Sequence, residues 1–412
     1  MIYGKKVTKF FILSSLLSNF SIFSMSTIKL HEPFIASKWK KDSSFQFSIN
    51  GYASFDDRAY NDDGDKVNVL RVFDADQNAL QMLNGFASSS DIGQLNVLIN
   101  ANDDGTRGHF LLDGNLDDYV LGFSGRLCLP ESFSISLDMP FHHRKLHNVV
   151  WQEQTKSLTA ADIRLKENLT NDFFAKVKTL SGGLDLEGWQ RSGLGDITML
   201  LNWNPDFQQP KPILKNIRLN LRSGLSFPTG KKKNEDKVLA FAFGNDGALG
   251  LLFGAGLDAT LGSFACIGLD VELTHLFGNK KNRRIKTNEK QTELLLLQKA
   301  YSFKDYGLTQ KFNLYAQWNI VKTLSLKIGY QFIRHGDDRL SLFSQDFSES
   351  IANSAISLEE WTMHNIFIVT SYSCNKLHNK INPSIKLFAQ LPFNGKNSVQ
   401  LSRLGIQLSI NF

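Results

Sequence analysis

The sequence predicts an all-β protein, an antiparallel transmembrane β-barrel of twelve strands with short helices in its outer loops. Segments of about ten residues alternate apolar and polar side chains along the chain, which is the length and pattern of a tilted strand that crosses a membrane. The connections between these segments are alternately short and long. Past the N-terminal region the chain has no apolar run of about 18 residues, so a helical membrane protein is excluded.

The clearest strand is the last one, residues 398–412. Apolar side chains occupy every second position from Leu404 to Phe412, and polar side chains or glycine lie between them. The strand therefore has one apolar and one polar face. A soluble edge strand would show the same alternation. The ending on Phe412 resembles the C-terminal strand of bacterial outer-membrane β-barrels, and this resemblance implies that the barrel-assembly machinery reads Phe412 as an assembly signal.

Eleven further strands precede the last one. We expect them at residues 44–55, 118–129, 132–141, 195–204, 216–227, 247–261, 264–276, 308–320, 323–334, 361–372 and 381–391. At one end all connections have eleven residues or fewer, whereas five of the six at the other end have 19 or more. A barrel with both termini in the periplasm joins its strands by short inner turns and long outer loops, which a soluble sandwich does not do.

Two outer loops carry helical patterns. Thr159 and Asp162 form a capping-box sequence before a helix that ends at Gly182, and residues 78–86 also have apolar side chains at helical spacing. These helices either pack within folded surface loops or fold inward and narrow the pore. Residues 93–100 and 109–114 could add two strands, giving fourteen, but both are short for spanning and are predicted as a hairpin within the first loop.

The N-terminus has the features of a secretory signal peptide. Lys5, Lys6 and Lys9 precede a 14-residue weakly apolar stretch, and small residues around Ser26 provide a cleavage site. A retained anchor is the alternative. We expect residues 1–26 to be the signal peptide and residues 27–412 to form a single barrel domain in the bacterial outer membrane.

The alternation also predicts which charged residues face the lumen. The basic ones are Arg126, Arg218, Arg222, Lys311, Lys327, Lys386 and Arg403, and the acidic ones are Asp138, Asp196, Asp258, Asp270 and Glu272. The acids fall on the third, fourth, sixth and seventh strands, whereas the eighth, ninth, eleventh and twelfth carry only bases. Opposed charged walls would select solutes by charge and dipole. Alternatively, the charges pair with one another and fill the interior.

The remaining motifs bear on function classes. The net charge of +6 is too mild to indicate nucleic-acid binding. The basic clusters at residues 231–233 and 280–284 either bind lipopolysaccharide phosphates, attract anionic solutes or keep the outer loops solvated. No disulfide, metal or cofactor pattern is present in Cys128, Cys266 and Cys374. No serine motif or paired acid accompanies the histidines that lie after the third strand, so we assign no catalytic residue and no enzyme activity. These histidines are His142, His143 and His147.

Two glycine-rich motifs carry a family resemblance. Ser192-Gly-Leu-Gly-Asp196 opens a strand, and Gly224-Leu-Ser-Phe-Pro-Thr-Gly230 follows on the next strand. The pair resembles the outer-membrane family named for the meta pathway of phenol degradation, barrels that are distantly similar to fatty-acid channels, although no counterpart of their long N-terminal plug is visible before Ser44. The resemblance implies passive uptake of small solutes, with aromatic or hydrophobic compounds as the candidate class. The alternative is a structural or adhesive surface barrel with a closed lumen.

Overall fold

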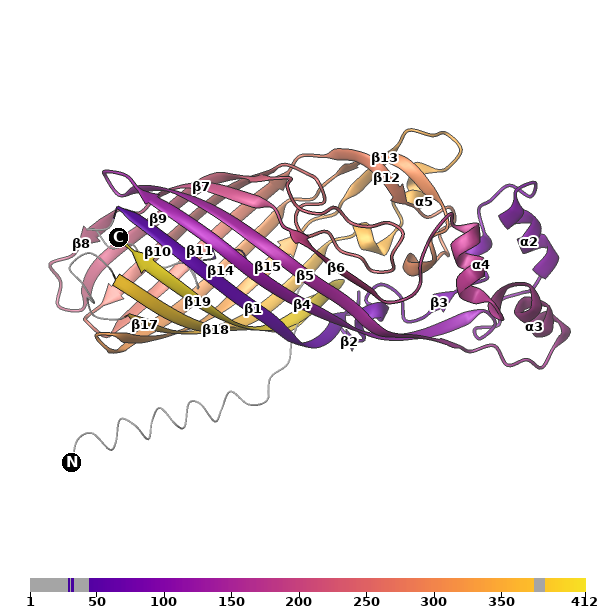
Figure 1. Cartoon of the computed structure of the whole chain (residues 1–412), viewed down its shortest axis with the longest axis horizontal. Coiled ribbons are helices and arrows are strands. Elements are labelled where there is room, and N and C mark those ends of the chain that lie inside the picture. Colours follow the sequence, from indigo (N-terminus) through magenta and orange to yellow (C-terminus); the bar gives the residue numbers. More distant parts are fainter. Residues whose placement is uncertain (1–28, 30, 33–43, 374–381) are drawn as a thin grey trace, which may run out of the picture.

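Twelve antiparallel strands close into a barrel in the computed structural model, which describes residues 29, 31, 32, 44–373 and 382–412 (Figure 1). The strands are β1 (Phe45–Tyr60), β4 (His109–Cys128), β5 (Phe133–Glu153), β7 (Ile197–Trp203), β9 (Leu214–Phe227), β10 (Gly250–Leu261), β11 (Ala265–Leu276), β14 (Thr309–Val321), β15 (Leu324–His335), β17 (Trp361–Ser373), β18 (Asn382–Lys396) and β19 (Ser398–Asn411). The last strand pairs with the first, Asn411 opposite Gln46, so the barrel has no free edge. The twelve-strand prediction is confirmed, and the fourteen-strand alternative is wrong. The predicted signal peptide lies outside the described residues.

The two faces of each strand differ as the alternation predicts. On β19 the side chain of Leu404 is 60% exposed on the outside of the barrel, whereas that of Arg403 next to it is fully buried in the interior. A belt of apolar side chains on the outside and a polar interior are the arrangement of a barrel surrounded by lipid.

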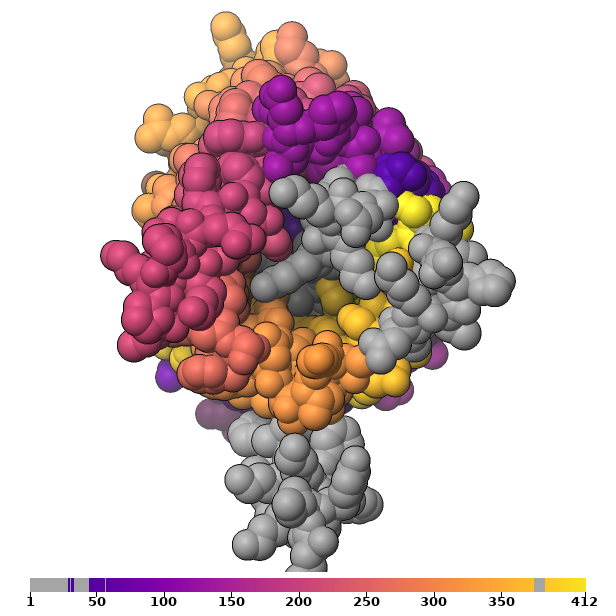
Figure 2. Space-filling model, turned by 90° about the vertical axis from the view of Figure 1, so that its left-hand side faces the viewer, coloured from indigo at the N-terminus to yellow at the C-terminus, as the bar shows by residue number. Residues whose placement is uncertain are grey.

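The short connections lie at one end, which we call the inner end, and the long loops lie at the outer end. The C-terminus is at the inner end, whereas α2 (Asp91–Ile99), α3 (Ala160–Leu165) and α4 (Phe173–Leu180) lie beyond the outer end (Figure 1). Viewed from the inner end, the barrel is hollowed at its centre (Figure 2).

The first loop departs from the prediction. Residues 109–114 are not part of a separate hairpin, because they form the outer part of β4, which continues well past the predicted start at residue 118. Residues 93–100 fall largely in α2 rather than in a strand. The Ser90 side chain accepts a hydrogen bond from the Gly93 backbone and caps this helix, a local signal that outweighs the short alternation. The predicted helix over residues 78–86 is replaced by β3 (Gln77–Asn78) and one 3-10 turn, η2 (Gln81–Leu83).

The capping-box prediction in the second loop is confirmed. The Thr159 side chain accepts from the Asp162 backbone, and the Asp162 carboxylate accepts from the Thr159 backbone. The helix continues through a π-helical turn, η3 (Lys166–Thr170), into α4, and the chain then passes through Gly182 with a positive φ.

The outer loops fold together into a cap with its own hydrophobic core. Buried side chains from the first loop, such as Leu83, pack with Val177 of the second loop, Leu239 of the third and Leu295 of the fourth. The remaining elements are β2 (Lys66–Val67), η1 (Val69–Arg71), β6 (Trp189–Leu194), β8 (Asp206–Gln208), β12 (Asn279–Arg284), η4 (Glu293–Leu295), β13 (Lys299–Asp305), β16 (Arg339–Leu342), α5 (Glu349–Ala352) and η5 (Ile356–Leu358). Among the described residues, every helix is too short or too polar to cross a membrane.

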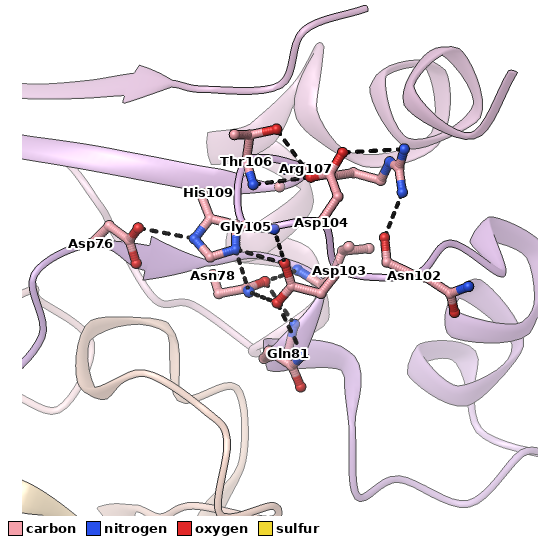
Figure 3. Close-up of polar contacts among 12 residues, drawn as sticks. Asp76, Asn78, Gln81, Asn102, Asp103, Asp104, Gly105, Thr106, Arg107 and His109 are labelled. Carbon is pink, nitrogen blue, oxygen red and sulfur yellow. Dashed lines mark hydrogen bonds and ion pairs between the residues drawn. The ribbon is translucent and has the colours of Figure 1, made fainter. Parts of the chain in front are cut away.

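A polar turn fixes the first loop within the cap (Figure 3). The ring of His109 lies between two carboxylates, with Nδ1 2.9 Å from Asp76 Oδ2 and Nε2 2.9 Å from Asp103 Oδ1. Asp103 also accepts hydrogen bonds from the Gly105 backbone and the Asn78 side chain. Burial alone would lower the pKa of His109, but the bonds to Asp103 and Asp76 outweigh it and raise this pKa above 6.5. The pKa of Asp103 falls to about 2, because bonds from Gly105, His109 and Asn78 outweigh its burial.

These two shifts predict a pH window for the turn. His109 contributes stability that is complete below its unfolded pKa of about 6.5 and is lost as the pH rises through its folded pKa. Asp103 contributes stability that is present above about 3.9 and is lost as the pH falls toward 2. We expect hydrogen exchange of residues 101–109, corrected for intrinsic rates, to speed up above neutral pH, and to do so much less in His109→Gln. Equal pH dependence in both proteins would contradict the assignment.

Candidate functional site: a cavity at the outer mouth of the barrel

A cavity of about 410 Å³ lies where the outer loops meet the barrel. The parts of its lining differ in chemistry. Residues 237–246 of the third outer loop, a largely apolar segment that includes Phe241 and Phe243, form one part of the lining. Polar side chains of the strands, such as Thr198 and Glu272, and residues of the later outer loops form the rest. The segment that folds inward toward the lumen is therefore the third outer loop, whereas the predicted helices lie in the cap.

Residues near the N-terminus also line the interior. The Nε2 atom of His31 lies 3.1 Å from Glu272 Oε2, and its Nδ1 atom lies 3.5 Å from Asp138 Oδ2. The carboxylate of Glu32 pairs with Lys311 and accepts a hydrogen bond from Gln331 at 3.3 Å. The sequence analysis did not predict that these two residues lie in the interior. Single charged side chains make these contacts, and single charges leave no periodic pattern in a sequence.

The predicted interior charges on β9, β11 and β14 are brought together. Arg222 donates to both oxygens of Asp270, at 2.6 and 2.8 Å, and to Glu272 at 3.0 Å. Lys311 lies 3.6 Å from the other oxygen of Glu272. Arg222 of β9 reaches its partners on β11 across β10, and Lys311 lies on β14, which is next to β11. The charges at this wall thus pair with one another, as the second of the two sequence-based alternatives expects.

A second ionic group lies on β4, β5 and β19. Asp118 accepts from Arg144 Nε at 2.8 Å and lies 3.4 Å from Arg403, and all three side chains are buried. The guanidinium of Arg403 also lies over the ring of Tyr52, 5.1 Å from its centre. Asp118 and Arg144 were missed from sequence, because Asp118 is the first residue of its expected strand and Arg144 lies beyond the expected end of the next strand at residue 141. The even-numbered register that places Arg126 and Asp138 inside would have found both.

The other predicted interior residues are not drawn into these two groups. Asp258 accepts a hydrogen bond from the Tyr315 hydroxyl at 2.6 Å, and Lys327 lies over the same ring at 4.5 Å. Arg218 pairs with Asp206 of β8 toward the inner end. Lys386 is buried on the interior face of β18, and Arg126 lies on the interior face of β4, partly exposed.

The three histidines after the third predicted strand separate onto different faces. His142 is buried and stacks on Phe243, with ring centres 5.5 Å apart. The ring of His143 hydrogen-bonds to Ser192 on the neighbouring strand at 2.6 Å, but its other nitrogen faces Gln190 at 3.5 Å rather than a carboxylate. His147 lies 3.2 Å from Asp117.

The two glycine-rich motifs meet beside the cavity. The Thr229 hydroxyl donates to the carbonyl of Gly195 at 3.0 Å and accepts from the backbone of Ile197 at 2.9 Å. The second motif is thus joined to the first where the third outer loop leaves the barrel wall.

Comparisons with known proteins find similarity to solved structures only at low sequence identity. No protein-family model matches the chain, and no curated protein matches its sequence. Among solved structures it is similar to an outer-membrane channel of Pseudomonas putida F1, with 13% identity, a TM-score of 0.49, and coverage of 91% of this chain and 100% of that one. A toluene transporter of Ralstonia pickettii has 9% identity, a TM-score of 0.35 and coverage of 90% and 89%. A toluene transporter of Pseudomonas putida has 8% identity, a TM-score of 0.35 and coverage of 90% and 91%.

Proposed function

We propose that the protein is an outer-membrane channel for the passive uptake of small solutes, and that solutes bind first in the cavity at its outer mouth. The observation that carries this proposal is the cavity itself. Its volume of about 410 Å³ lies within the usual range of small-molecule sites, and it combines an apolar wall with polar groups as such sites do.

The lining favours uncharged solutes with an apolar body and a polar group. Acidic and basic side chains are equally numerous around the cavity, seven of each, so the lining has no net charge from them. The acids are Asp138, Asp196, Glu235, Asp246, Glu272, Glu293 and Asp338, and the bases are Lys29, Arg144, Lys233, Lys237, Arg284, Lys304 and Lys311. Aromatic side chains such as Phe241, Phe243 and Tyr306 supply the apolar surface. This chemistry agrees with the aromatic or hydrophobic compounds that the family resemblance implies.

Outer-membrane location and assembly belong to the same proposal. Residues 1–26 direct secretion, and the apolar outer face of the barrel strands contacts lipid and lipopolysaccharide. The Phe412 side chain lies next to Phe45, with ring centres 6.2 Å apart, and the Phe412 backbone donates to the Phe45 carbonyl at 2.8 Å. Phe412 thus closes the seam between the first and last strands.

Deleting Phe412 should therefore lower the amount of assembled barrel in the outer membrane. The deletion removes the final hydrogen bonds of the seam as well as the aromatic ending, whereas Phe412→Trp keeps both. The measurement is the fraction of heat-modifiable protein on a gel after cell fractionation. Wild-type levels of the shortened protein would contradict the role of Phe412.

A surface barrel with a closed lumen is the second candidate. The observation that favours it is the contact of His31 and Glu32 with the interior of the barrel wall, together with the folded cap over the outer end. Conductance in planar lipid bilayers separates the two candidates. The channel proposal predicts discrete openings that are reduced by benzyl alcohol, an uncharged aromatic solute, more than by benzoate at equal concentration.

A further inference from the structure

We propose that Asp196 is a positioning residue that ties the third outer loop, residues 228–249, into the mouth of the barrel and thereby sets the size of the cavity. The tie itself stands on the geometry alone, and its consequence for solutes rests on the proposed channel function.

Asp196 lies at an interruption of the barrel wall. β6 ends at Leu194, opposite Phe141, and β7 places Thr198 opposite Asp138. Two residues of β5 thus face three residues of the neighbouring strand, which is the count of a β-bulge. The Gly195 backbone still donates to the Pro140 carbonyl at 2.8 Å, but the Ile197 backbone donates to Thr229 instead. The bulge turns Asp196 inward, where it is buried beside the cavity.

The carboxylate of Asp196 binds both ends of the loop. Its Oδ1 atom accepts from the Gly230 backbone at 2.8 Å, and its Oδ2 atom accepts from the Asn245 backbone at 2.5 Å. Within the described part of the chain, no lysine or arginine lies within ion-pair distance of it. Hydrogen bonds to a charged acceptor are about twice as strong as neutral ones, so one buried side chain closes a loop of some fifteen residues.

The packing at Gly244 is fitted to the same carboxylate. A Cβ atom added at Gly244 would lie 2.2 Å from Asp196 Cγ, and the three atoms nearest to it all belong to Asp196. The loop can approach this closely only because position 244 has no side chain.

Between these two ties the loop enters the barrel mouth. Phe243 is buried, and the guanidinium groups of Arg144 and Arg191 lie 5.6 and 5.1 Å from its ring centre. Arg144 also donates to the Ala242 carbonyl, and Arg191 donates to that of Phe241. The segment that Asp196 holds in place is the apolar wall of the cavity, so release of the tie would widen the mouth.

Hydrogen exchange measured by mass spectrometry on the detergent-solubilised full chain tests the tie. We expect Asp196→Ala to raise exchange in residues 229–246 by about tenfold or more, because two charge-assisted hydrogen bonds are lost. Exchange in the barrel strands should stay unchanged. The matched control is Asp258→Ala, which removes a buried carboxylate from the same barrel away from the loop. Unchanged exchange of the loop in Asp196→Ala, or an equal rise in Asp258→Ala, would overturn the proposal.

The Gly244→Ala variant gives a second test that keeps the carboxylate. We expect it to loosen the same peptides through the clash with Asp196, and we expect the double variant Asp196→Ala/Gly244→Ala to exchange no faster than Asp196→Ala. If the two substitutions raise the exchange rate additively in the double variant, Gly244 and Asp196 act separately. This result would contradict the claim that the packing at Gly244 is fitted to the Asp196 carboxylate. If Asp196→Ala does not assemble, the hydrogen exchange of the third outer loop in Gly244→Ala tests the proposal by itself.

Conductance separates this proposal from the channel function. We expect the single-channel conductance of Asp196→Ala to exceed that of wild type by about twofold or more, since loops at the mouth limit the pore. Faster loop exchange in a barrel that never conducts would support the tie and contradict the channel. Faster loop exchange with unchanged conductance would overturn the claim that the tie sets the size of the cavity.

Discussion

Replacing Arg403 by glutamate should severely impair barrel assembly. Arg403 is fully buried and lies 3.4 Å from Asp118, which is also fully buried. The substitution would bring two carboxylates together where water is excluded, beside the one guanidinium of Arg144. Removing one partner of a buried ion pair commonly costs about 3 to 5 kcal/mol, and reversing its charge costs at least as much. The measurement is the urea midpoint of unfolding of the barrel in lipid vesicles, together with the heat-modifiable fraction.

Two control variants make this prediction specific to the pair. Arg403→Lys keeps the charge and should retain most of the stability. In Arg403→Gln/Asp118→Asn, where no buried charge is left unpaired, part of the loss should be recovered relative to Arg403→Gln alone. If Arg403→Glu assembles with a wild-type midpoint, the ionic group on β4, β5 and β19 does not stabilise the barrel.

Replacing both His31 and Glu32 by alanine should raise the conductance of the barrel. These side chains extend into the interior to reach Glu272, Asp138 and Lys311. Their removal widens the lumen at this level and leaves the facing charges of the wall available to ions. We expect an increase of about twofold or more in single-channel conductance, since pore radius and lining charge control conduction.

The conservative variant Glu32→Gln is the matched comparison. It keeps the size of the side chain and removes only its charge, so it should change ion selectivity more than conductance. Identical conductance of the alanine double variant and wild type would show that His31 and Glu32 do not narrow the path of ions.

The barrel could be predicted because its determinant is periodic. The alternation from Leu404 to Phe412 assigns each residue to one face, and the same rule, applied to eleven other segments, locates every strand of the barrel. The capping box at Thr159 was equally readable, because a helix start depends on residues three positions apart. Local signals of this kind need no knowledge of distant parts of the chain.

The errors arise where the local signal is incomplete. Residues 93–100 alternate like a strand, yet Ser90 caps a helix there. The continuation of β4 to His109 depends on pairing with β5, which also extends far beyond its expected length. Because β5 continues past residue 141, His142 and Arg144 belong to the interior rather than to a loop.

The partners of the interior charges could not be read from the sequence. Arg222 and Glu272 are 50 positions apart, and Glu32 and Lys311 are 279 apart, so no spacing rule connects them. If these residues simply faced a water-filled lumen, reversing their charges would leave folding nearly intact. The residues are Lys311, Lys327, Lys386 and Arg403. The pairs of Lys311 with Glu32 and of Arg403 with Asp118 give the opposite expectation for those two residues. The Gly-rich motifs were visible in the sequence, but their joint role in holding the third outer loop depends on contacts across the barrel wall.

Single-channel recording of the purified, heat-modifiable barrel in planar lipid bilayers is the most direct test of the proposed channel. The account predicts discrete openings in wild type that benzyl alcohol reduces more than benzoate does, because the cavity has an aromatic wall and balanced charges. Repeated reconstitutions of correctly assembled protein without openings would contradict the channel and leave a structural surface barrel with a closed lumen.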